Sequence, residues 1–231
     1  FSHWYKNIYN VELDYETEIL PLMGSKEGIM HTSMAFCNPG DRVLIPNPGY
    51  PAYTSVAQLL NLNIQFYNLN EENNWLPDFD ELESLYNDRC KIMWINYPHM
   101  PTGKVANKSD LKKLVMWAKY RNILLINDNP YSLILNDNPV SVLSFFNDYE
   151  NLIELNSLSK SHNMAGWRVG MLAGSSENIN QVIKVKSNFD SGMYKPVQLA
   201  ASKALQLGSD WYNKLNNEYV KRREIVWEIL D

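Results

Sequence analysis

One lysine of the chain stands in a setting that suits covalent chemistry with a carbonyl compound. Lys160 follows the hydroxyl residues Ser157 and Ser159 and precedes Arg168. An amine between hydroxyl groups and a guanidinium can form a Schiff base beside a bound phosphate. The alternative is that Lys160 is an ordinary solvated lysine. The run 152–156 predicts a short buried strand that ends just before this segment, and open α/β sheets bind ligands at such strand ends. We therefore interpret Lys160 as a nucleophile.

A second segment has the features of an anion-binding site. Gly24, Ser25 and Lys26 open a predicted helix that continues to Phe36. The free backbone N–H groups at a helix start, the helix dipole and a hydroxyl group together attract an anion. The alternative is that Ser25 is a plain N-cap and Lys26 a surface charge.

An acid and a tyrosine follow another buried strand. The run 123–127 is apolar, Asp128 comes directly after it, and Tyr131 follows in the same segment. A carboxylate at the end of a rigid strand can keep the ring nitrogen of a ligand protonated. The alternative is a turn aspartate before Asn129 and Pro130, which is the interpretation that this segment by itself favours.

These segments lie within a regular alternation of strands and helices. Apolar, β-branched runs alternate with stretches of helical period, which indicates βαβ units and a mainly parallel sheet. Helices are predicted over 52–60 and over 110–121, the second with Ser109 as its N-cap. The predicted strands are 42–45, 64–69, 91–96, 123–127, 152–156 and 169–174. The expected fold class is α/β, with three α/β/α layers.

Two proline-rich loops each follow a predicted strand. Prolines punctuate the chain within 46–51 and again within 98–101. Because the carboxyl ends of parallel strands meet at one edge of a sheet, both loops should lie on the same side as Lys160.

Composition and charge restrict the class of partner. The 231 residues are 45% hydrophobic, which excludes a disordered chain, and a formal net charge of −5 provides no basic field for nucleic acid. The two cysteines and four histidines lack metal-site spacing, so no metal is expected. No apolar run approaches the ~20 residues that cross a bilayer, and no signal peptide opens the chain. We expect a soluble, cytoplasmic protein that binds small molecules, with neither nucleic acid nor a membrane as partner.

Five segments occur in an order that resembles a known family. They are Leu20-Pro21-Leu22-Met23-Gly24-Ser25-Lys26-Glu27-Gly28, Asn47-Pro48-Gly49-Tyr50-Pro51, Asn96-Tyr97-Pro98-His99-Met100-Pro101-Thr102-Gly103, Asn127-Asp128-Asn129-Pro130-Tyr131 and the stretch 157–170. Each alone is a weak signal. Together they resemble the cofactor motifs of the class I and II aminotransferases, which are fold-type I pyridoxal-phosphate enzymes. The first two segments are most similar to the L,L-diaminopimelate aminotransferase subgroup.

The resemblance implies a role for each candidate residue. Lys160 would hold pyridoxal 5'-phosphate as a Schiff base and then move a proton between Cα and C4′ as general base and acid. Asp128 would bind the ring nitrogen, Tyr131 would donate to the phenolic oxygen, and Tyr50 would stack on the ring. The residues implied to bind the phosphate are Ser25, Lys26, Ser157, Ser159 and Arg168.

Met100 departs from the family pattern. The chain has Met100-Pro101-Thr102-Gly103 where the family usually has Asn-Pro-Thr-Gly, whose asparagine donates a hydrogen bond to the phenolic oxygen. Methionine cannot donate one. Losing a hydrogen bond to a charged group costs ~1.5–3 kcal/mol, or roughly ten- to a hundredfold in a dependent step. Tyr131 would cover part of this loss, and Asn96 is a possible substitute, so we expect weaker activity rather than none.

The family pattern also predicts a domain organisation. Residues 1–231 correspond to the cofactor-binding large domain, without the N-terminal segment and the C-terminal small domain. We expect a homodimeric aminotransferase that moves an amino group between an L-amino acid and a 2-oxo acid, and we expect this chain alone to be inactive. Two alternatives stay open: a carbon–sulfur lyase that uses the same cofactor, and a non-catalytic pyridoxal-phosphate-binding paralogue or sensor.

Overall fold

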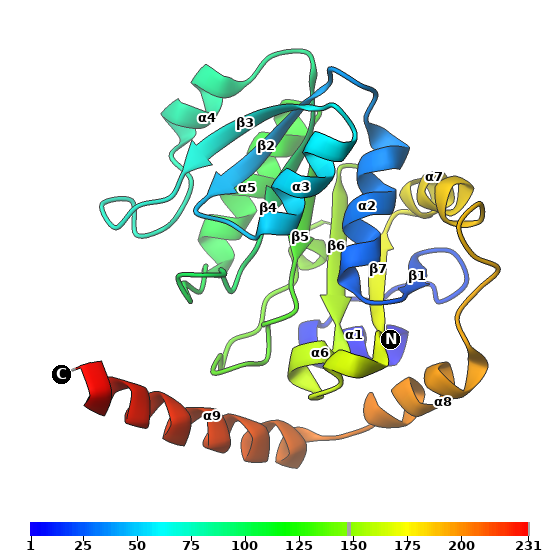
Figure 1. Cartoon of the computed structure of the whole chain (residues 1–231), viewed down its shortest axis with the longest axis vertical. Coiled ribbons are helices and arrows are strands. Elements are labelled where there is room, and N and C mark those ends of the chain that lie inside the picture. Colours follow the sequence, from blue (N-terminus) through cyan, green and yellow to red (C-terminus); the bar gives the residue numbers. More distant parts are fainter. Residues whose placement is uncertain (147–148, 231) are drawn as a thin grey trace.

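A seven-stranded sheet forms the centre of the molecule (Figure 1). The computed structural model describes residues 1–146 and 149–230. The strands are β1 (Ile19–Leu22), β2 (Arg42–Asn47), β3 (Asn63–Asn68), β4 (Cys90–Ile95), β5 (Leu124–Asp128), β6 (Leu152–Ser157) and β7 (Gly170–Gly174). Their order is β1-β7-β6-β5-β4-β2-β3. β7 pairs antiparallel with both of its neighbours, and the remaining pairs are parallel.

Helices cover both faces of this sheet. The helices of the described residues, not all of which cover the sheet, are α1 (Ser2–Tyr9), α2 (Ser25–Phe36), α3 (Pro51–Leu59), α4 (Phe79–Leu85), α5 (Lys108–Tyr120), α6 (Leu158–Ser161), α7 (Ser176–Lys186), α8 (Lys195–Ala204) and α9 (Ser209–Leu230), with short 3₁₀ turns η1 (Val142–Ser144) and η2 (Ala165–Trp167). Met93 of β4 packs in the core beneath α1, α4 and α5. Its neighbour Trp94 packs beneath α2, α3 and α7, because successive strand residues point to opposite faces. The predicted three-layer α/β/α fold is confirmed.

All six predicted strands form, with ends that differ from the predictions by at most two residues. β1 was not predicted. It has four residues, one of them Pro21, and lies at the edge of the sheet, where the missing N–H of a proline leaves no ladder bond unmade. A short strand with a proline has too little alternation to be recognised in the sequence.

The predicted N-cap of α5 was wrong. The helix begins at Lys108, and Asn107 rather than Ser109 is its N-cap, with its side chain accepting a 3.0 Å hydrogen bond from the Asp110 N–H. Asparagine caps a helix as well as serine does, and Asn107 adds two residues of helix before Asp110.

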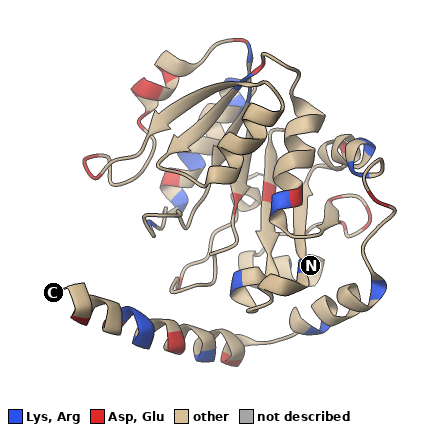
Figure 2. Ribbon diagram, viewed as in Figure 1, with Lys and Arg blue, Asp and Glu red and all other residues tan. Residues whose placement is uncertain are grey.

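α9 runs along one edge of the molecule, away from the sheet (Figure 1). Its start is attached to the body, since the Trp211 indole N–H donates to the Ser161 carbonyl at 2.9 Å. Acidic and basic residues alternate along it (Figure 2). In the part of the chain that the structure describes, no helix combines the length and the apolar character needed to cross a membrane.

Candidate active site

All nine candidate residues line one cavity of about 470 Å³ at the carboxyl ends of the parallel strands. They are Ser25, Lys26, Tyr50, Asp128, Tyr131, Ser157, Ser159, Lys160 and Arg168, and the wall also contains Asn96, Met100, Pro130 and Ala165. The prediction that the two proline-rich loops lie on the same side as Lys160 is confirmed by the positions of Tyr50 and Met100. The arrangement collects residues from distant parts of the chain around one volume.

Lys160 is positioned by a capped turn. Ser157 ends β6 and caps α6, where its Oγ accepts a 3.1 Å hydrogen bond from the Ser159 N–H. The Ser157 hydroxyl also donates to the Ser159 Oγ at 2.8 Å. Lys160 is half-buried, and its Nζ lies 5.7 Å from the centre of the Tyr131 ring. Lys160 is therefore carried into the cavity wall on a short helix, together with the two serines.

The start of α2 gives the cavity the composition of an anion site. Gly24 caps α2 with a left-handed φ of 85°, and a Cβ at this position would lie 2.1 Å from an Arg168 guanidinium nitrogen. Only glycine lets the guanidinium lie so close to the helix start. Arg168 itself donates to the Ala165 carbonyl at 2.8 Å. The Lys26 amine lies 5.6 Å from the Tyr50 ring centre, so two cations and the first N–H groups of α2 converge here.

Asp128 is the last residue of β5 and is buried in the wall of the cavity. One carboxyl oxygen accepts a 3.1 Å hydrogen bond from the Tyr53 hydroxyl, and the other, Oδ1, has no hydrogen-bond partner among the described residues. Burial raises the pKa of Asp128 to about 7, although the bond from Tyr53 acts in the opposite direction. A buried carboxyl with one unsatisfied oxygen fits a ligand that brings a cationic N–H.

Tyr53 was missed by the sequence analysis. It is fully buried, and its ring stacks on that of Trp94 with centroids 4.9 Å apart and planes 9° from parallel. It follows Tyr50 by one helical turn, and this i, i+3 spacing was the available signal. Without knowledge of which strand α3 crosses, the sequence did not reveal that Tyr53 meets Asp128.

The two tyrosines of the cavity wall lie around the same space. Tyr131 is half-buried, and its pKa is raised by burial and, further, by the negative charge of Asp128. The Tyr50 ring meets that of Tyr53 edge-on, with centroids 5.6 Å apart. The Tyr50 ring thus has the Lys26 amine over one face and is in edge contact with Tyr53, which bonds to Asp128.

Met100 lies in the cavity wall, and Asn96 lies beside it. The Asn96 amide is already engaged: its Nδ2 donates to the Asp128 carbonyl, and its Oδ1 accepts the Met100 N–H at 2.8 Å. A carboxamide nitrogen carries two hydrogens, and these bonds use only one of them. Asn96 therefore supports the loop and the acid first, and can offer at most one donor to a ligand.

The mainly parallel sheet carries a lysine amine, a buried acid and a helix start with two cations around one cavity, and its fold is that of fold-type I aminotransferases. Among residues 1–146 and 149–230, no group of three or more His, Cys, Asp or Glu side chains is placed to hold a metal ion. The chain belongs to the family of class I and II aminotransferases, whose family model matches residues 1–231.

Individual relatives agree with this assignment. The chain is 43% identical over 232 residues to the LL-diaminopimelate aminotransferase of Aquifex aeolicus, covering 100% of this chain and 60% of the relative. It is 42% identical to the same-named protein of Dehalococcoides mccartyi, covering 99% of this chain and 60% of the relative. Substrate-bound BacF of Bacillus subtilis superimposes with a TM-score of 0.92 at 35% identity, over 96% of this chain and 56% of that one. The chain thus spans about 60% of the length of the curated relatives that it matches.

Proposed function

We propose that this chain is the cofactor-binding part of a pyridoxal-phosphate-dependent aminotransferase that moves an amino group between an L-amino acid and a 2-oxo acid. The observation that supports this most is the unpartnered Oδ1 of buried Asp128 in the same cavity as the Lys160 amine. The similarity to LL-diaminopimelate aminotransferases makes LL-diaminopimelate the first amino acid to test. By analogy with the domain pattern of the family, residues 1–231 would be the large domain of a cytoplasmic homodimer.

The residues around the cavity fit pyridoxal phosphate. When bound, the cofactor supplies an aldehyde that condenses with amines and a pyridine ring that takes up the charge left when a substrate α-proton departs. Asp128 would hold the ring nitrogen, and Tyr50 and Tyr131 would lie against the ring. The phosphate would be held by Ser25, Lys26, Ser157, Ser159 and Arg168, which surround the start of α2.

Asp128 would keep a proton on the ring nitrogen. Its carboxyl is poised by burial, which raises its pKa to about 7, so a cationic N–H at Oδ1 would stabilise the ionised form. Tyr53 would orient this carboxyl by holding the other oxygen at 3.1 Å. A bound cationic N–H would therefore lower the pKa of Asp128 and increase the fraction of the carboxyl that is ionised near neutral pH.

Lys160 would bind the aldehyde carbon through Nζ and, once displaced by a substrate amine, would accept and return the α-proton at the same atom. Its turn is fixed by the Ser157 cap, so the amine would stay near the reacting carbon throughout. Tyr131, with a ring 5.7 Å from Nζ, would limit the access of water from that side.

The test is reduction of the purified protein with borohydride after incubation with pyridoxal phosphate, followed by mass mapping. The expected result is one stable adduct, on Lys160. An adduct distributed over surface lysines would contradict the proposed site.

A second experiment identifies the products that the full-length protein forms. A new amino acid formed from a 2-oxo acid would support transamination, whereas pyruvate and ammonia would identify a carbon–sulfur lyase. Cofactor binding without any turnover would identify a non-catalytic paralogue or sensor, the function that Met100 would favour.

Restoring asparagine at position 100 should increase the activity of the full-length protein. Met100→Asn would add a donor in the cavity wall, and a hydrogen bond to a charged oxygen is worth ~1.5–3 kcal/mol, so the rate of a dependent step should rise roughly ten- to a hundredfold. The pKa of the Lys160–cofactor linkage, followed by absorbance against pH, should shift as well. Unchanged rate and unchanged titration in Met100→Asn would show that another donor already occupies this place.

A further inference from the structure

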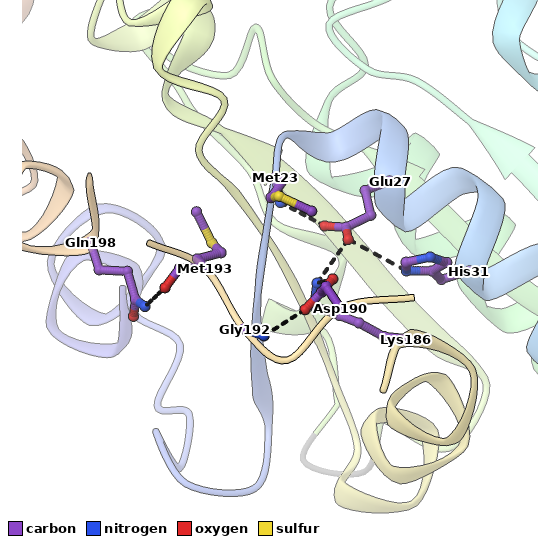
Figure 3. A network of polar contacts seen from close by, with 8 residues as sticks. All are labelled: Met23, Glu27, His31, Lys186, Asp190, Gly192, Met193 and Gln198. Atoms are coloured by element: carbon purple, nitrogen blue, oxygen red, sulfur yellow. Dashed lines mark hydrogen bonds and ion pairs between the residues drawn. The ribbon is translucent and has the colours of Figure 1, made fainter. Parts of the chain in front are cut away.

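A buried cluster of charges lies at the first turn of α2, the helix that begins with Ser25 and Lys26 (Figure 3). Glu27 of α2 accepts a 2.7 Å hydrogen bond from the amine of Lys186, the last residue of α7. Lys186 also donates to Asp190. The Lys186 side chain is only 8% exposed and that of Glu27 11%. Buried charges of this kind are rarely kept unless each has its partner.

This cluster is connected to the residues proposed to bind the phosphate. The second oxygen of Glu27 accepts a 2.6 Å hydrogen bond from the Met23 N–H, immediately before Gly24. Glu27 therefore closes the turn that contains Gly24, Ser25 and Lys26, as an acid in the first turn of a helix commonly does. In Figure 2 a basic and an acidic residue adjoin in this first turn of α2.

The same acid presents an electrostatic problem for an anion site. Glu27 lies two residues from Ser25, and an uncompensated carboxylate there would repel a phosphate dianion. Lys186 supplies the opposite charge. Its pKa is lowered by burial, but the hydrogen bonds that it donates to Asp190 and Glu27 outweigh this and raise it. The hydrogen bond from Lys186 in turn lowers the pKa of Asp190, so the ammonium stabilises the ionised form of that carboxyl as well.

The remaining neighbour, His31, does not supply this charge. It is buried, its Nδ1 lies 3.8 Å from the same Glu27 oxygen, and that nitrogen has no hydrogen-bond partner among the described residues. Burial lowers its pKa, although Glu27 opposes this, so the imidazole is the weaker counter-charge. Lys186 is then the cation that offsets Glu27, and it shares its ammonium with Asp190.

We propose that Lys186 and Glu27 are positioning residues for the phosphate: Glu27 holds the binding turn of α2 in shape, and Lys186 cancels the charge that Glu27 would otherwise present to the dianion. Neither residue lines the cavity, so both act through Ser25 and Lys26. This inference rests on the proposed phosphate site. It adds α7, which the sequence analysis did not connect with ligand binding, to the elements that determine cofactor affinity.

The experiment compares dissociation constants for pyridoxal phosphate and for pyridoxal, which lacks the phosphate, at pH 8. In Lys186→Met, the affinity for pyridoxal phosphate should fall about tenfold while the affinity for pyridoxal changes little, because only the former meets the uncompensated carboxylate. Adding Glu27→Gln to Lys186→Met should restore part of the preference for pyridoxal phosphate, since glutamine still accepts the Met23 N–H while Asp190 keeps its charge. Lys184→Met is the matched control: Lys184 is exposed on the same helix and bonds to Gln181, away from Glu27, and thus should keep the parent preference.

The outcomes separate this inference from the proposed function. A parent protein that binds pyridoxal phosphate no more tightly than pyridoxal would overturn the phosphate site together with the inference. A parent that discriminates, with a Lys186→Met variant that keeps the same preference, would overturn the inference alone. If Lys186→Met does not fold, the double variant and Lys186→Arg carry the comparison. Lys186→Arg should keep the parent's preference for pyridoxal phosphate over pyridoxal, and the preference of the double variant should lie within a fewfold of the parent's. Loss of this preference in both variants would overturn the charge-cancelling role.

Discussion

Replacing Lys160 with alanine should abolish amino-group transfer by the full-length protein. General acid–base catalysis by a positioned group contributes roughly 10²–10⁴-fold, and the covalent attachment is lost with the same amine, so we expect turnover to fall by at least about a thousandfold. Stability should change little, because Lys160 is half-buried and its amine lies at the cavity rather than in the core. Turnover is measured at saturating cofactor, and unfolding by heat shows that the variant is folded.

The absorbance of bound cofactor gives an independent reading of the same substitution. Lys160→Ala should bind pyridoxal phosphate noncovalently, without the spectral change that marks attachment to lysine and without an adduct after borohydride. Lys203→Ala is a suitable control, because Lys203 is exposed on α8, bonds to Gln206 and lies outside the cavity wall. A spectral change in Lys160→Ala as large as in the parent would assign the covalent chemistry to a different amine.

The elements that place these residues were largely predictable from local pattern. β5 opens with three consecutive apolar residues, β6 has apolar residues at 152, 153 and 155, and each strand is buried throughout and ends at a residue with a polar side chain. The carboxyl ends of such strands meet at one edge, so Asp128 and Lys160 could be placed together from the sequence alone. β1 was missed because its pairing with β7 is antiparallel and distant in sequence, and its four residues carry no alternation of their own.

The partners of the candidate residues were not predictable in the same way. Tyr53 and Asp128 are separated by 75 residues, and Glu27 and Lys186 by 159, and each pair meets only because a helix crosses the sheet at a particular place. In the sequence Tyr53 is one aromatic among many, and Lys186 is one of several lysines in its segment. The local sequence pattern does not specify which side chain of a helix faces which strand end.

The environment of Asp128 makes this acid a source of instability that a bound cofactor should relieve. In the cofactor-free protein, burial favours the neutral carboxyl, so its folded pKa of about 7 lies above the ordinary value of 3.8. A carboxyl with a raised folded pKa contributes stability that is fully present below its unfolded pKa and is lost as pH rises through the folded pKa. The free energy of unfolding of the cofactor-free protein should therefore fall between about pH 4 and pH 7, by up to about 4 kcal/mol from this group.

Asp128→Asn should remove this pH dependence and, in the full-length protein, most of the activity. Asparagine does not titrate, so the cofactor-free variant should gain on the parent by up to about 4 kcal/mol between pH 4 and pH 8, as measured by urea unfolding at each pH. With cofactor bound, the parent should be the more stable of the two proteins, because asparagine offers no charge to a protonated ring nitrogen. Removing one partner of a buried charge pair costs about 3–5 kcal/mol, so turnover should fall by about a thousandfold. Asp137→Asn, at an exposed position outside the cavity, should alter neither quantity. A parent whose stability follows the same pH course as Asp128→Asn would mean that the acid at the end of β5 is ionised in the folded protein before any ligand arrives.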